Sequence, residues 1–189
     1  MGLTAEEIKQ RRPFRSAGHE ATVSLLLTAD LVRRGVARVV EPAGITLQQF
    51  NVLRILRGAG AEGVPTLEIA GRMIEQAPGI TRLMDRLEAK GLVRRQRCPT
   101  DRRQVLCWIT PPGLRLVASL DKPLAERDEA FLRALGRERA ARFIGLLDAV
   151  RAAHRSGGDR SARSRTAKSP AVARRGGPRQ TKPSRRRRE

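Results

Sequence analysis

The sequence predicts a mainly α fold with one small β-hairpin, a minor α+β arrangement. Apolar residues recur at helical spacing through most of residues 16–153, and strand-like alternation replaces this pattern only between residues 92 and 109. The 189 residues are 40% hydrophobic, which is enough for one core, and two cysteines are too few for a disulfide framework. We therefore expect one domain over residues 1–155, followed by a tail over residues 156–189.

The first long helix is expected from about residue 16 to residue 40, where apolar residues recur every three or four positions between arginines. The segment 41–44, Glu-Pro-Ala-Gly, ends it. The next helix begins with a capping box, in which Thr46 is the N-cap residue and Gln49 stands at the third helical position. This second helix is expected to end at Gly58.

A third, short helix is expected to begin with Thr66 as its N-cap, and a fourth is expected over residues 77–90 with Gly91 as its C-cap. The predicted apolar positions of the third helix are Leu67, Ile69, Ala70, Met73 and Ile74. Strand-like segments then enclose the turn 98–103, and two more helices follow, ending near residues 133 and 153. A helix-turn-helix followed by a hairpin is a winged helix, and we place this core at residues 45–113.

The fourth helix and the hairpin together point to DNA. The apolar stripe of the fourth helix consists of Ile80, Leu83, Met84 and Leu87. On the opposite face Arg82 and Arg86 are four residues apart, so both project from the same side, and an arginine can bridge O6 and N7 of guanine in the major groove. Alternatively, these are solvated arginines of a surface helix, paired to Asp85 or Glu88.

The hairpin carries five arginines between residues 94 and 103 and a single acid, Asp101. A tip that presents Arg102 and Arg103 has the size and charge to enter a narrow minor groove. Asp101 is expected to orient the guanidinium of Arg103 by a charge-assisted pair. The predicted DNA-binding residues are Gln76, Ala77, Pro78, Gly79, Thr81, Arg82, Arg86, Arg102 and Arg103, with Asp101 as the residue that orients the wing.

Half of the formal net charge of +20 lies in residues 156–189, which hold twelve Lys and Arg and two acids among many Ser, Gly and Pro. Such a segment cannot bury enough apolar surface to offset its ordering entropy, so we expect it to be disordered. It is either an electrostatic arm on nucleic acid or a solubilising tail. Residues 1–155 carry the other half of the net charge, so the argument for a polyanionic partner does not depend on the tail.

Four stretches within residues 45–113 resemble the MarR family of bacterial transcriptional regulators in order and spacing. They are LQQFNVLRIL (47–56), TRLMDRLEAKGLVRR (81–95), DRR (101–103) and ITPPG (109–113). The resemblance implies a homodimer in which helices within residues 14–41 and 111–154 pack against their symmetry mates. Two winged-helix lobes would then lie in successive major grooves of a pseudo-palindromic operator in double-stranded DNA.

The resemblance further implies that the helix 77–90 reads bases in the major groove and that the wing 98–103 enters the minor groove. Family members typically repress transcription, and many release DNA when a small, commonly phenolic, ligand binds between the dimerisation and DNA-binding parts. Gln76 and Gly79 stand where the family often has Ser or Thr, so the resemblance does not extend to the operator sequence. The alternative function is a sequence-tolerant architectural DNA-binding protein driven by the basic tail.

No motif in the sequence indicates an enzyme active site, a metal site or a cofactor-binding site. The glycine motif G-x-G-x-x-G at residues 58–63 follows a capped helix rather than a strand, so we interpret it as a loop between helices and not as a dinucleotide site. Arginines around Cys98 are expected to lower its pKa, while Cys107 should pair nearer Arg94, beyond disulfide reach of Cys98. With no secretory signal and no long apolar run, we expect a cytoplasmic protein without a membrane partner. The resemblance implies that it is bacterial and nucleoid-associated.

Overall fold

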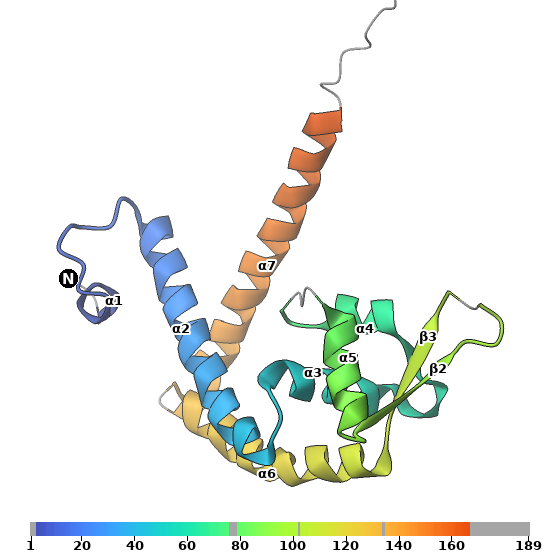
Figure 1. Cartoon of the computed structure of the whole chain (residues 1–189). Coiled ribbons are helices and arrows are strands. Elements are labelled where there is room, and N and C mark those ends of the chain that lie inside the picture. Colours follow the sequence, from blue (N-terminus) through green and yellow to red (C-terminus); the bar gives the residue numbers. More distant parts are fainter. Residues whose placement is uncertain (1–2, 76–78, 102, 134, 167–189) are drawn as a thin grey trace, which may run out of the picture. The chain divides into compact units, whose positions relative to one another are not determined.

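The computed structural model describes residues 3–75, 79–101, 103–133 and 135–166, and the chain divides into one unit of residues 1–134 and another of residues 135–189 (Figure 1). The helices of the first unit are α1 (Leu3–Glu7), α2 (Ala17–Val40), α3 (Leu47–Ala59), α4 (Thr66–Arg72), α5 (Ile80–Ala89) and α6 (Pro111–Arg133), with 3-10 turns η1 (Glu41–Ala43) and η2 (Gly60–Glu62). Its strands are β1 (Val64–Pro65), β2 (Val93–Arg97) and β3 (Val105–Ile109). The second unit contains α7 (Gly136–Thr166). The predicted mainly helical fold with a small wing is confirmed.

The predicted helix boundaries hold where side chains cap the backbone. Ser16 caps α2, its hydroxyl accepting a hydrogen bond from the His19 amide at 3.2 Å. The capping box of α3 is complete: the Thr46 hydroxyl accepts from the Gln49 amide at 3.2 Å, and the Gln49 side chain accepts from the Thr46 amide at 3.0 Å. These bonds explain why both helices begin where the sequence predicts.

A third strand was not predicted. β1 pairs with β3, so the antiparallel sheet has the order β1-β3-β2, and Val64 lies opposite Cys107. The prediction that Thr66 caps α4 is wrong, because Pro65 is the N-cap residue and the Thr66 hydroxyl donates to the Val105 carbonyl at 3.1 Å. Thr66 therefore ties the start of α4 to the sheet.

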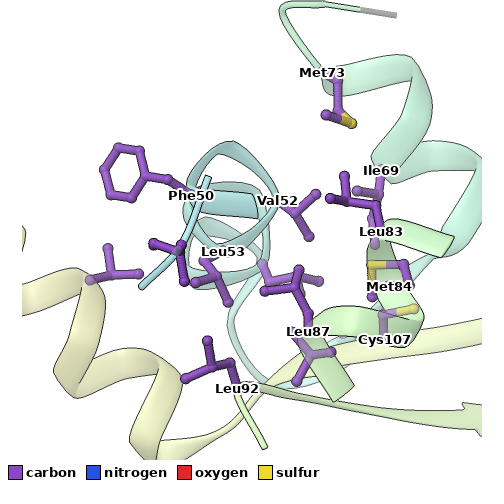
Figure 2. Packing of buried hydrophobic residues seen from close by; sticks show 14 of the residues in the cluster. Phe50, Val52, Leu53, Ile69, Met73, Leu83, Met84, Leu87, Leu92 and Cys107 are labelled. Atoms are coloured by element: carbon purple, nitrogen blue, oxygen red, sulfur yellow. The ribbon is translucent and has the colours of Figure 1, made fainter. Parts of the chain in front are cut away.

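The core of the first unit is built around α3. Figure 2 shows Val52 and Leu53 of α3 facing Met84 and Leu87 of α5, while Phe50 points to the other side of α3. Val52, Leu53, Met84 and Leu87 are completely excluded from solvent. This packing fixes the back of α5 and leaves its opposite face free.

Two apolar positions predicted for the third helix do not reach this core. Leu67 is 83% exposed, and Ile74 is 86% exposed beyond the end of α4. α4 is only seven residues long, and Ile69 and Met73 fill its buried side. The apolar spacing of residues 66–74 therefore predicted a wider buried face than this short helix has.

The hairpin has the register that a turn near residues 100–101 implies. Arg95 lies opposite Cys107, and Arg94 lies opposite Trp108, so the prediction that Cys107 pairs close to Arg94 is confirmed. Beyond β3, a Cβ on Gly113 would lie 2.3 Å from the Leu92 carbonyl oxygen, which shows how closely the first turn of α6 approaches the start of the wing.

Two helices differ in length from the prediction. α5 begins at Ile80, and Gly79 before it has a left-handed φ of 101°. α7 runs to Thr166, past the expected end at residue 153 and into the segment predicted to be disordered. Residues 167–189 lie outside the described residues, and the domain boundary at residue 155 stays a prediction. No helix of the described residues is both long and apolar enough to cross a membrane.

Candidate nucleic-acid interface

α5 presents a basic face to solvent. Leu83, Met84 and Leu87 are buried, whereas Arg82 and Arg86, one helical turn apart, are exposed on the other side. Thr81 and Gly79 are exposed at the beginning of the helix. Of the residues predicted to contact DNA, Gln76, Ala77, Pro78 and Arg102 lie outside the described residues.

The backbone conformation at position 79 favours glycine even in the absence of DNA. Its φ of 101° lies in the region that only glycine adopts without strain, and nothing lies within 4 Å of where a Cβ would stand. Among the described residues, no atom therefore blocks a close approach to the backbone at Gly79.

The acids of α5 do not pair with its arginines. Within the described residues Arg82 and Arg86 form neither an ion pair nor a side-chain hydrogen bond. Instead, Arg95 of β2 holds both acids: its Nη2 lies 2.7 Å from Asp85 Oδ1 and 2.5 Å from Glu88 Oε2. The alternative in which Asp85 or Glu88 neutralises the arginines of the helix does not match this structure.

Glu88 accepts more than one bond from Arg95. The Arg95 Nε donates to Glu88 Oε2 at 2.8 Å, and the Arg95 backbone amide donates to Glu88 Oε1 at 3.1 Å. The hydrogen bond to the Glu88 carboxylate is the main cause that raises the pKa of Arg95 above the ordinary arginine value, against the opposing effect of burial. Arg95 is thus a fixed cation, although in the sequence it is only one of five arginines of the wing.

Asp101 stabilises the turn of the wing. Its Oδ1 accepts from the Arg103 backbone amide at 3.0 Å, and its Oδ2 accepts from the Gln104 side chain at 2.9 Å. No ion pair joins Asp101 to the Arg103 guanidinium in the described part of the wing. In this structure Asp101 orders the backbone of the turn, while the Arg103 side chain is exposed, and the role of Asp101 in orienting the wing toward DNA stays a prediction.

The base of the wing is held by Trp108. Its Nε1 donates to the Ala61 carbonyl at 2.9 Å, and the Arg94 Cζ lies 4.0 Å from the ring centroid. A Cβ on Gly63 would lie 2.4 Å from the indole. The glycine motif at residues 58–63 therefore begins in the last turn of α3, continues as η2 and ends at Gly63, against a tryptophan of the wing. A helix precedes it, as predicted, but the next element is the strand β1 and not a helix.

The two cysteines are free thiols, and Cys107 is buried. Hydrogen bonding, first with the Thr100 hydroxyl and then with the backbone at Asp101 and Thr100, lowers the pKa of Cys98. The predicted direction holds, and among the described residues its main causes are these hydrogen bonds rather than the charge of Arg95, which is turned toward α5. Burial raises the pKa of Cys107. The described residues contain no group of three or more His, Cys, Asp or Glu that could hold a metal ion.

A cavity that the sequence did not reveal lies between α2, α3 and the residues after α4. Its volume is about 560 Å³. Apolar side chains form most of its wall, among them Val36, Phe50 and Ile74. Four charged side chains also line it, two cations and two acids: Arg33, Arg54, Asp30 and Glu75. These residues are far apart in the sequence, so no local pattern could have indicated a common cavity.

Comparison with known proteins agrees with this arrangement. Residues 45–105 match the model of the MarR family. The chain is 37% identical to a MarR transcription factor from Planctomyces limnophilus, with a TM-score of 0.56 over 72% of this chain and 98% of that one. It is 27% identical to the HTH-type transcriptional regulator FarR from Neisseria gonorrhoeae, over 71% of this chain and 91% of FarR.

The fold is also that of a mutant Escherichia coli MarR crystallised with operator DNA. The TM-score is 0.62 at 24% identity, over 79% of this chain and 99% of that one. Residues 45–105, which the family model matches, contain α3, α5 and β2 with the turn 98–103 of the wing. The chain therefore belongs to the MarR family, whose members are DNA-binding transcriptional regulators with a winged helix-turn-helix and not enzymes.

Proposed function

We propose that the protein is a homodimeric repressor that reads a pseudo-palindromic operator, with the segment 77–90 in the major groove and the wing 98–103 in the minor groove. The observation that carries the proposal is the exposed face of α5, where Arg82 and Arg86 have no acidic partner among the described residues. An arginine without a protein partner has its full set of donors available for a base edge or a phosphate. Arg103 would act in the same way from the wing.

The test is a selection of bound sequences from random duplexes at physiological salt, followed by affinity measurements on the selected site. Arg82→Ala and Arg86→Ala are each expected to cost about 1–3 kcal/mol and to relax the preference at particular bases. Arg115→Ala, an equal change of charge at an exposed position of α6, is the matched control and should leave the selected motif unchanged. Binding without any motif would refute the proposal and favour the sequence-tolerant architectural function.

The proposed dimer is supported by apolar side chains that the separate units leave exposed. They are Leu25, Leu26 and Leu31 on α2, and Ile144, Leu146 and Val150 on α7. Apolar patches of this kind on a helix are typical of protein interfaces. Sedimentation at micromolar concentration should give twice the monomer mass, and a monomer there would contradict this part of the proposal.

The cavity between α2 and α3 supports a response to a small ligand. Its apolar wall suits an aromatic ring, and Arg54, which forms no ion pair among the described residues, suits an acidic or phenolic group, whereas Arg33 is already paired with Asp30. Using 4-hydroxybenzoate as the probe, we expect release of the selected DNA site. Ala29→Phe, which places a ring in the cavity, should abolish this release while leaving DNA affinity in the absence of the probe unchanged.

A further inference from the structure

The helix α5 carries no net charge. Within Ile80–Ala89 two arginines are matched by Asp85 and Glu88. Asp85 stands between the two arginines in the sequence and is exposed, so it lies next to the surface that would face DNA. A carboxylate at that surface would repel phosphates and compete with them for the neighbouring guanidinium groups.

Arg95 removes this conflict. Its guanidinium contacts both carboxylates, and its side chain is only 23% exposed, against 54% for Asp85 and 40% for Glu88. Glu88 receives three hydrogen bonds from Arg95, one of them from the backbone of β2. The acids are therefore drawn toward the wing, and the arginines of the exposed face stay unpaired.

We propose that Arg95 is a positioning residue for DNA binding, which masks Asp85 and Glu88 so that the exposed face of α5 acts as a purely cationic surface. The inference rests on the proposed function, because it assumes that this face meets DNA. In this proposal Arg95 affects DNA binding by neutralising the acids of α5 and does not itself contact DNA.

Arg95→Met keeps an unbranched apolar stem but leaves both carboxylates without their cation. Its affinity for the selected operator is expected to fall about 10- to 100-fold at low salt, as for like charges brought together at an interface. The loss should shrink as salt rises from about 0.05 M to about 0.5 M, because the Debye length shortens. A defect of folding alone would not depend on salt in this way.

The decisive variant combines Arg95→Met with Asp85→Asn and Glu88→Gln. The amide oxygen at position 88 can still accept the bond from the backbone of β2, so the attachment of the wing is kept while the repulsion is gone. Binding should return to within about threefold of the wild type. If the triple variant binds as weakly as Arg95→Met, then Arg95 contacts DNA itself or serves only the fold, and the proposal is overturned.

A matched control breaks an ion pair of similar geometry elsewhere. Arg57 Nη1 lies 2.8 Å and 3.0 Å from the two oxygens of Asp121, between α3 and α6. Arg57→Met is expected to leave operator affinity unchanged within about twofold, since it exposes no acid on α5. Failure of the proposed function would appear separately, as an Arg82→Ala variant that reads the operator normally, and that result would not depend on Arg95.

Discussion

Two glycines of the motif at residues 58–63 are expected to respond in opposite ways to the same substitution. Gly63 has φ 74° and ψ 166°, a backbone conformation that is almost exclusive to glycine and costs another residue about 1–3 kcal/mol. Its Cβ would also stand 2.4 Å from the indole of Trp108, which would have to move. Gly58 is in the last turn of α3, and its Cβ would meet nothing within 4 Å.

The magnitudes follow from what Trp108 would lose. Its hydrogen bond to Ala61 contributes about 0.5–1.5 kcal/mol, and the Arg94 contact about 0.5–1 kcal/mol at an exposed site. With the backbone term, Gly63→Ala should destabilise the protein by about 2–5 kcal/mol. Gly58→Ala should stabilise it by about 0.5–1 kcal/mol, the ordinary gain of alanine over glycine in a helix.

Urea unfolding, followed by far-ultraviolet circular dichroism at one fixed protein concentration, measures both effects. Trp108 is the single tryptophan of the chain, so its fluorescence reports separately on the base of the wing. Its emission should shift with Gly63→Ala in the folded state and stay constant with Gly58→Ala. Equal shifts of the unfolding midpoint in both variants would refute the reasoning, because only the close contact and the backbone conformation distinguish the two sites.

Three further predictions concern the capped helix, the thiols and the joint after the wing. Thr46→Ala removes the hydroxyl that accepts from the Gln49 amide and should cost about 0.5–2 kcal/mol by the same urea assay, whereas an unchanged midpoint would contradict the capping box. The thiolate is the reactive form of cysteine, and a lowered pKa means that it forms at lower pH. Iodoacetamide should therefore modify Cys98 before the buried Cys107. The rate of Cys98 modification should reach half of its maximum at a lower pH than that of an ordinary thiol. Mass spectrometry that finds Cys107 modified first would disprove this. Gly113→Ala forces the first turn of α6 away from the Leu92 carbonyl and should lower the free energy of unfolding by about 1–3 kcal/mol. An unchanged unfolding midpoint would contradict this close contact.

The sequence predicted the features that depend on neighbouring residues. The capping box needs only Thr46 and Gln49, three residues apart, and both of its hydrogen bonds are present. The position of the turn predicted that Cys107 pairs near Arg94 and far from Cys98, and Cys107 lies opposite the neighbouring residue, Arg95. In each case the interacting groups are fixed by short-range geometry, so the pattern and the structure agree.

Features that depend on long-range contacts were missed. β1 is two residues long and follows a glycine loop, so only its pairing with β3 makes it a strand. Thr66 looked like a cap because its residue type suits that role, but the nearby strand offers its hydroxyl another acceptor. The reach of Arg95 to α5 depends on the angle between the helix and the strand, which spacing alone does not give.

Charge composition by itself cannot separate a reader of sequence from a general DNA binder. The described helix α5 has no net charge, and it becomes a cationic surface only because Arg95 holds its acids. Residues 167–189, by contrast, hold nine Lys and Arg and one acid, a charge that needs no particular geometry to attract phosphates.

Deleting residues 167–189 should flatten the salt dependence of binding to every duplex, since fewer counterions are released. The ratio of operator to random-DNA affinity should remain, because in the proposed function that ratio comes from groups held in fixed positions on α5 and the wing. If the deletion made the two affinities equal, then residues 167–189, and not the folded surface, would select the site.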